Sequence, residues 1–316
     1  AMVIPEAIPT NPVDTVTKEN SAVVNAHYRG SKGRVLVDSL ASIRPREFVT
    51  LQVLDYYFDA PLDREEWYST GSKWPMLKDI KWNHTVHDEN RMKRSMNDIH
   101  RIYLPGEQRE ETWLGAANGL ADREITMAYR EGDKFTLNIF EQGDSQPGHW
   151  GNFAFDYPED TSVARLYKDG KLLTTSNYFS FFYPLSVSPD PATYRITMDT
   201  AHPTGFRMST QTNTAWTFKS ERPASGRENL GLLWPTYDLE LDGENKTKGG
   251  NTYHFDLSFS LQSGDTPDIK GVEVEVSTDD GVTWNTAKVS SEKDGHYKVS
   301  VKNPKSGYVS LRVKAW

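Results

Sequence analysis

The feature that most constrains this chain is a strict alternation of valine and polar residues at positions 272–277 (VEVEVS). A period of two places the valines on one face and the polar side chains on the other, which is typical of a half-buried β-strand. Asp280 and Gly281 follow, and an Asp-Gly pair favours the positive φ angles of a tight hairpin turn. Trp284 then opens the returning strand and is large enough to cover a sandwich core. This stretch predicts a β-hairpin.

The same order of short strand, tight turn and short strand recurs along the chain. It predicts an all-β protein made of jelly-roll or β-sandwich domains. Hairpins are predicted at 22–28 with 34–40 across Gly30 and Gly33, at 125–129 with 134–140, and at 162–174 across Asp169-Gly170. Further strands are predicted at 48–58, in the polar run that ends at Trp113, and at 178–187, 194–198 and 215–219.

Two segments of the first half fit this pattern less well. Residues 59–81 contain many turn-forming residues, so we expect an irregular connection there. Residues 84–101 are charged and carry Met92, Met96 and Ile99 at spacings of four and three, which is compatible with a short helix. We favour an irregular strand for the second segment and leave the helix open.

The domain organisation follows from the strand pattern and one polar stretch. Residues 220–229 (SERPASGREN) have no apolar period and are the best linker candidate. We therefore expect an extended lead-in at 1–20, a sandwich or jelly-roll region at 21–222, and a smaller sandwich of immunoglobulin or fibronectin type at 230–316. The region at 21–222 is either one domain or two, with a break near residue 150. The smaller domain has predicted strands at 236–241, 253–261, 272–276, 284–289, 297–301 and 309–313.

Composition excludes several classes of function. The chain has 316 residues, a net charge of -8 and no cysteine, so it has no disulfide, thiolate metal site or cysteine nucleophile. A net negative charge disfavours general nucleic-acid binding, and we expect no nucleic-acid partner. No run of about 18 apolar residues is present, so we expect no membrane span. The first residues lack a signal-peptide pattern, and both ends indicate a piece of a longer protein.

Candidate metal ligands occur in three places. His84 and His87 form an HxxH pattern, which on a helix would put both imidazoles on one face, but a solvated loop is the simpler interpretation. Asp279 with Asp280, and Asp242 with Glu244, offer oxygen ligands without the spacing of an EF-hand. We expect no cofactor and no metal, and we leave a structural Ca²⁺ open.

Residues 277–284 (STDDGVTW) match the Asp-box pattern S-x-D-x-G-x-T-W. In sialidases this motif recurs once per propeller blade, whereas here it occurs once. We therefore predict a hairpin clasp, in which Asp279 bonds the turn amides and Trp284 packs, and no glycosidase site.

Exposed aromatic residues are the remaining candidates for ligand binding. Trp67, Trp74 and Trp82 form the densest tryptophan region and would suit a platform that stacks on sugars, although core packing is the commoner role of tryptophan. No G-x-S-x-G motif exists, and we predict no catalytic residue in this chain.

Several motifs resemble the region that follows the protease domain in large secreted subtilisin-like serine proteases of actinobacteria. They occur in the same order as in that family, and the similarity covers roughly residues 95–316. The matching stretches are 103–108 (YLPGEQ), 111–115 (ETWLG), 148–151 (GHWG), 166–170 (LYKDG), 192–197 (ATYRIT), 214–220 (TAWTFKS), 272–284 (VEVEVSTDDGVTW) and 306–316 (SGYVSLRVKAW).

The resemblance implies a secreted protein whose catalytic domain precedes this region. In the family, the catalytic Asp, His and Ser stand in D-[ST]-G, H-G-T-H and G-T-S-M-A settings, and none of these settings is present here. No catalytic residue is therefore carried over. The implied partners are the catalytic domain of the parent protease and protein substrate. The alternative is a carbohydrate- or cell-surface-binding module with polysaccharide as its partner.

Overall fold

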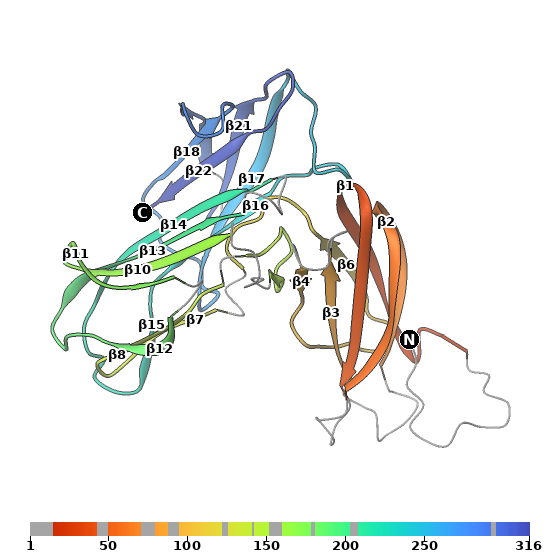
Figure 1. Ribbon diagram of the computed structural model, residues 1–316, viewed down its shortest axis with the longest axis horizontal. Helices are drawn as coiled ribbons and strands as arrows, with labels where there is room; N and C mark the ends of the chain where they lie inside the picture. The colour runs from red at the N-terminus through yellow and green to blue at the C-terminus, as the bar shows by residue number, and fades with distance from the viewer. Residues whose placement is uncertain are drawn as a thin grey trace. The chain divides into compact units, whose positions relative to one another are not determined.

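The chain folds entirely into β-structure (Figure 1). The structure is a computed structural model, and no helix occurs in the residues that it describes. These residues are 15–42, 50–70, 80–87, 95–121, 126–140, 142–151, 160–177, 181–202, 208–291 and 295–316. The all-β prediction is confirmed, and two of the cores are β-sandwiches.

The chain divides into two compact units. The first contains residues 1–115 and the short segment Gly243–Asn245, and the second contains the remaining residues from Ala116 to Trp316. The predicted break near residue 150 is therefore wrong, and the division lies at Gly115 and Ala116. Residues 142–151 lie inside the second unit, where the backbone N–H of Gly151 donates to the carbonyl of Gln142 at 2.7 Å.

The first unit is one sheet organised around its longest strand, β1, which pairs antiparallel with β2 along nearly its whole length. On its other side, β1 pairs parallel with β6 near its start and antiparallel with β3 near its end. The strands are β1 (Ser21–Ser42), β2 (Thr50–Ser69), β3 (Lys81–His87), β4 (Ser95–Asn97), β5 (Arg101–Ile102) and β6 (Gln108–Trp113). Figure 1 shows β1 and β2 side by side as long curved ribbons.

The hairpin predicted across Gly30 and Gly33 does not form, because β1 continues through both glycines. Opposite them on β2 stands Pro61, which has no N–H to donate to the ladder. The pairing of Tyr28 with Leu62 is followed by that of Gly33 with Ala60, so β1 carries a bulge against Pro61. Gly30 lies in this bulge at a φ of 131°, which a residue with a side chain rarely adopts.

The irregular connection predicted at 59–81 is also wrong up to residue 69, because β2 runs through to Ser69. The segment 84–101 is extended where it is described, as favoured over the helix. Strand β4 pairs antiparallel with β3, and Met96 lies opposite Val86 in the buried core. Met92 lies outside the described residues.

The second unit begins with a sandwich of two four-stranded sheets. One sheet has the order β11-β10-β13-β14 and the other β12-β8-β7-β15, and both contribute buried side chains to one core. The predicted hairpin turns form, with positive φ at Gly132, Asp169 and Gly170. The strands of these two sheets are β7 (Met127–Glu131), β8 (Lys134–Asn138), β10 (Thr161–Lys168), β11 (Lys171–Ser176), β12 (Phe181–Ser186), β13 (Ala192–Ala201), β14 (Gln211–Ser220) and β15 (Arg227–Asn229). The two-residue strand β9 (Trp150–Gly151) is part of neither sheet.

The C-terminal strands form a smaller sandwich of four plus three strands, as predicted. Its sheets have the orders β16-β17-β21-β20 and β19-β18-β22 and enclose a core that includes Phe255, Val274 and Val299. The strands are β16 (Leu233–Asp238), β17 (Thr252–Leu261), β18 (Val272–Ser277), β19 (Asn285–Thr286), β20 (Lys288–Ser291), β21 (His296–Lys302) and β22 (Ser310–Ala315).

The stretch at 220–229 is not a free linker. Its last residues form β15, which pairs with β7, and the next apolar residues enter the middle core. Trp234, on β16, packs against Trp216 with ring centroids 5.2 Å apart, and its indole N–H donates to the carbonyl of Ala121. The middle sandwich therefore extends to about residue 234, and β16 passes from its core to that of the C-terminal sandwich.

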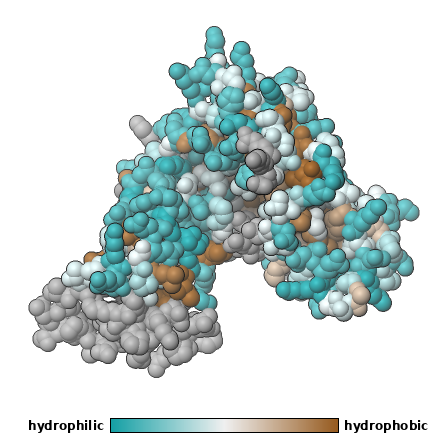
Figure 2. Space-filling view, turned by 180° about the vertical axis from the view of Figure 1, so that it is seen from behind, coloured by the Kyte–Doolittle hydropathy of each residue, from teal (hydrophilic) through white to brown (hydrophobic). Residues whose placement is uncertain are grey.

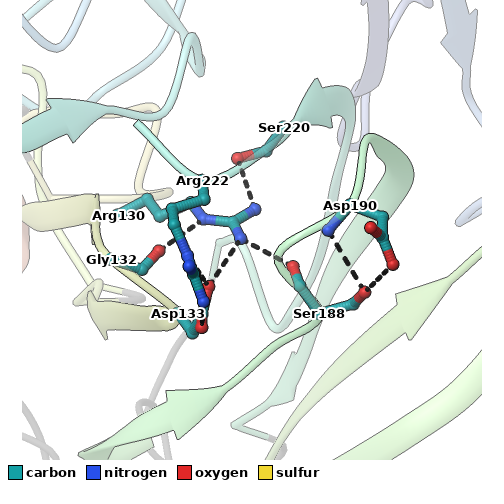
Figure 3. Close-up of polar contacts among 7 residues, drawn as sticks. All are labelled: Arg130, Gly132, Asp133, Ser188, Asp190, Ser220 and Arg222. Carbon is teal, nitrogen blue, oxygen red and sulfur yellow. Dashed lines mark hydrogen bonds and ion pairs between the residues drawn. The ribbon is translucent and has the colours of Figure 1, made fainter. Parts of the chain in front are cut away.

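A buried arginine ties together the end of the middle sandwich (Figure 3). Arg130, on β7, has a side chain only 1% exposed. Its guanidinium donates to the carbonyls of Gly132 at 2.9 Å and Ser188 at 2.6 Å, and to the hydroxyl of Ser220 at 3.3 Å. Beside it, Arg222 forms an exposed two-point ion pair with Asp133. One cation thus fixes the β7–β8 turn, the segment before β13 and the end of β14.

We predict that Arg130→Met destabilises the middle sandwich by about 3 kcal/mol, because three partly buried acceptors lose a charged donor. The measurement is denaturant unfolding followed by amide exchange of β7 and β8. Arg195→Met is the matched control, since Arg195 is exposed on β13, and we expect a change within about 0.5 kcal/mol. Equal effects of the two substitutions would contradict this role for Arg130.

Candidate functional site

Strand β2 presents two polar faces at residues 63–68 (DREEWY). Alternation turns the odd-numbered side chains outward, where Asp63 and Glu65 are exposed, and the even-numbered ones inward. The inward set places a charged pair, Arg64 and Glu66, beside the buried Tyr68. The first unit therefore has an inner polar centre and an outer polar face on one strand.

The inner centre is built on the carboxylate of Glu66, whose side chain is 9% exposed. It accepts hydrogen bonds from the hydroxyls of Tyr28 at 2.7 Å, Tyr56 at 3.2 Å and Tyr68, and from Arg64 Nε at 2.6 Å. Burial alone would raise the pKa of Glu66, but the tyrosine donors and the charge of Arg64 outweigh it, so its pKa is lowered. Glu66 is held as a carboxylate.

The aromatic groups around Glu66 are equally fixed. The guanidinium of Arg64 lies 4.2 Å from the ring centroid of Tyr56 and 4.8 Å from that of Phe58, which is a cation–π arrangement. Burial and the charge of Glu66 raise the pKa of Tyr28, Tyr56 and Tyr68. These hydroxyls stay protonated at neutral pH, so they serve as donors to Glu66 and not as acids or bases in a reaction.

A second buried pair lies in the same core. His84, on β3, has its Nδ1 at 2.8 Å from Asp98 Oδ2, and its backbone N–H donates to Asp98 Oδ1 at 2.7 Å. Burial lowers the pKa of His84, but the charge and hydrogen bond of Asp98, together with the charges of Glu111 and Glu66, outweigh it and raise the pKa overall. The side chain is 2% exposed, so it is inaccessible to a substrate.

The structure separates the predicted platform tryptophans. Trp82 is fully buried and its indole N–H donates to the carbonyl of Ser69 at 2.9 Å, so its assignment to an exposed platform is wrong. The cause is the inward alternation of β3, in which Trp82, His84 and Val86 share the buried face. Trp74 lies outside the described residues. Trp67 is half-buried on β2, and its indole N–H donates to Glu65 at 2.6 Å.

The accessible candidate site is the outer face of β2, β1 and β6. We define this outer face by seven residues, namely Asn25, His27, Arg29, Asp63, Glu65, Trp67 and Glu110. His27 Nδ1 lies 2.8 Å from Asp63 on β2, and His27 Nε2 lies 2.8 Å from Glu110 on β6. Arg29 donates to Asp63 at 2.6 Å, and Asn25 donates to Glu110 at 2.8 Å.

The hydrogen bond from His27 lowers the pKa of Asp63, and those from Asn25 and His27 lower the pKa of Glu110.

The Asp-box turn forms the predicted clasp. Asp279 accepts from the backbone N–H of Thr283 at 2.9 Å and from its hydroxyl at 2.6 Å, and these bonds lower the pKa of Asp279 to about 2. The indole N–H of Trp284 donates to the carbonyl of Gly281 at 3.0 Å, and Arg312 lies over the indole ring at 4.4 Å. The Asp279 carboxylate is thus used by the turn itself.

Neither a triad nor a metal cluster assembles in the described part of the chain. Ser300 and His254 are hydrogen-bonded at 2.7 Å, but no described carboxylate contacts this exposed histidine. His84 and His87 are three residues apart on a strand, so their side chains point to opposite faces. Over the described ranges, no three His, Asp or Glu side chains are placed to hold a metal ion. The Asp242 carboxylate instead caps the backbone N–H of Lys246 at 2.9 Å.

Sequence reasoning missed Arg64, Glu66, His27 and Glu110. The R-x-E-x-Y spacing at 64–68 is the one available signal, because it puts two opposite charges on the face of a buried aromatic residue. The contact of His27 with Glu110 depends on the parallel pairing of β1 with β6, which joins residues far apart in the sequence.

The hydropathy of the surface does not point to a further candidate site. Figure 2 shows a face covered mostly by hydrophilic residues, with hydrophobic residues in separate patches. Within the described residues, no helix has the length and apolar character needed to cross a membrane.

No family model and no curated protein matches the sequence. Among solved structures, the chain has a TM-score of 0.22 and 11% identity to E. coli alpha-2-macroglobulin, with 94% of this chain and 20% of that chain covered. It has a TM-score of 0.17 and 9% identity to extracellular domains 3–5 of Drosophila OTK, with 98% of each chain covered. The chain therefore spans about a fifth of the length of the former. Similarities of this size carry no argument about function.

We predict that Glu66→Gln destabilises the first unit by about 3 to 5 kcal/mol, because Arg64 loses its buried counter-charge. Denaturant unfolding with amide exchange of β1 and β2 measures it. Glu65→Gln, the adjacent exposed position, is the control and should stay within about 0.5 kcal/mol. An equally small effect at Glu66 would show that the centre does not stabilise the unit.

We predict that His84 makes the first unit less stable as pH rises. Because its pKa is raised in the folded state, its contribution is complete below the unfolded histidine pKa of about 6.5 and is lost as pH rises through the folded value. The difference in amide protection of β3 between the wild type and His84→Gln should shrink from pH 6 to pH 9. His254→Gln, in the C-terminal sandwich, is the control. A difference that does not change with pH would contradict the prediction.

Proposed function

We propose that this chain is the non-catalytic β region of a secreted subtilisin-like serine endopeptidase, where it contacts the catalytic domain or positions protein substrate. The observation that carries the proposal is the ordered series of family-like motifs over residues 95–316. No catalytic role within this chain is part of the proposal.

The positions of the motif residues support it. Tyr103, Trp113, His149, Tyr194 and Trp216 each belong to a motif and are each buried. Other motif residues make the turn at Asp169-Gly170 and the Asp-box clasp. The resemblance therefore concerns residues that specify a β framework, as expected for an accessory region.

The carbohydrate-binding alternative has weaker support. Of the three tryptophans on which it was based, Trp82 is in the core and Trp74 lies outside the described residues. Trp67 alone is on an accessible face, and its indole N–H is already bonded to Glu65. We therefore keep polysaccharide binding as an outcome of the test below.

We predict that the purified chain cleaves no peptide bond above blank, and that the gene upstream of it encodes a G-T-S-M-A stretch in the same reading frame. A protein-substrate assay with and without a serine-protease inhibitor, together with sequencing of the upstream gene, measures both. Inhibitor-sensitive proteolysis by the chain alone, or an upstream frame without that stretch, would contradict the proposal. Saturable polysaccharide binding that is lost in Trp67→Ala would favour the alternative.

A further inference from the structure

His27 lies between two carboxylates that belong to different strands. Its Nδ1 is 2.8 Å from Asp63 Oδ1 on β2, and its Nε2 is 2.8 Å from Glu110 Oε2 on β6. The imidazole is 27% exposed, whereas the carboxylates are 62% and 69% exposed. The ring therefore bridges three neighbouring strands at a site that solvent protons can reach.

The two contacts require a particular protonation state. A neutral imidazole has one N–H and one lone pair, whereas an imidazolium ion has two N–H donors. Ionised carboxylates only accept hydrogen bonds, so both contacts are satisfied together only when His27 is protonated. With neutral His27, one nitrogen lone pair would face a carboxylate oxygen at hydrogen-bonding distance.

The neighbouring hydrogen-bond donors keep the carboxylates of Asp63 and Glu110 ionised. On β1, Arg29 donates to Asp63 at 2.6 Å and Asn25 donates to Glu110 at 2.8 Å. Glu65, on β2, bonds Trp67 instead of the imidazole. The pKa of Asp63 and that of Glu110 are both lowered, so the carboxylates remain charged at pH values where histidine is protonated.

The strand held by this bridge is the last one of the first unit. Strand β6 ends at Trp113, and the second unit begins at Ala116. In the described residues, β6 pairs with β1 alone. On its inner face Trp113 is buried in the core, and on its outer face the contact of Glu110 with His27 is a further attachment to β1.

We propose that His27 is a proton-dependent clamp that fastens β6 to β1 and β2 and loosens the end of the first unit as pH rises. This inference goes beyond the proposed function and does not depend on it. Histidine changes charge between about pH 5 and 8, so the clamp is complete at the acidic end of this range. At the alkaline end, neutral His27 keeps one carboxylate and releases the other, while Asn25 still holds Glu110.

The test is the amide-exchange protection of residues 108–113 in the full chain at pH 5.5 and pH 8, corrected for intrinsic exchange. In the wild type we expect protection to fall roughly two- to fivefold at pH 8, the scale of one exposed ion pair. Glu110→Gln supplies an amide N–H₂ that can donate to the lone pair of neutral His27, so it should reduce the fall to the part that comes from the buried His84. His27→Gln should reduce it to the same level, because glutamine gains and loses no proton.

Glu65→Gln is the matched control, since it changes a carboxylate on the same face that does not contact His27, and it should keep the wild-type fall. The exchange of β2 in the same samples reports whether the first unit of each variant is folded. Equal wild-type protection at both pH values would overturn the proposal. A fall in either His27→Gln or Glu110→Gln that is as large as in the wild type would also overturn it, because the whole loss would then arise elsewhere.

Discussion

The first unit depends on satisfying one buried negative charge, the carboxylate of Glu66. Its donors come from both long strands, with Tyr28 on β1 and Tyr56, Arg64 and Tyr68 on β2. A one-residue slip between the strands would turn Tyr28 outward and leave the carboxylate short of a donor inside the core. The charge therefore fixes the register of the longest ladder in the molecule, although it adds little favourable energy by itself.

Register in turn sets the outer face. Once Glu66 is inward, Glu65 and Trp67 must point outward, and so must Asp63 beside His27. The parallel pairing of β1 with β6 then brings Glu110 to the other side of the imidazole. The accessible site is thus a geometric consequence of the buried one.

The parts of the fold that local sequence controls could be predicted. The Asp-box clasp and the hairpin at Asp169-Gly170 form within a few residues, so their patterns are sufficient. The continuity of β1, in contrast, depends on its pairing with β2, and the division at Gly115 depends on which strands pair. Tryptophan spacing does not reveal which face of a strand is buried, so it wrongly predicts an exposed Trp82. Non-local pairing decides these features, and a single sequence does not display it.

The contacts made by ionisable groups also differ in the pH range over which they are lost. The Asp279 carboxylate, which holds the Asp-box turn, stays ionised far below neutral pH, because its hydrogen bonds lower the pKa of Asp279 to about 2. That contribution is lost only as pH falls through this value, so the C-terminal sandwich keeps its clasp across the range in which histidines titrate. In the first unit, Asp98 favours the protonated form of His84, and His27 needs two N–H donors to satisfy its two carboxylates. A rise in pH therefore weakens the first unit while this turn in the second remains unchanged. The proposed release of Glu110 acts on β6, the last strand before the second unit begins at Ala116.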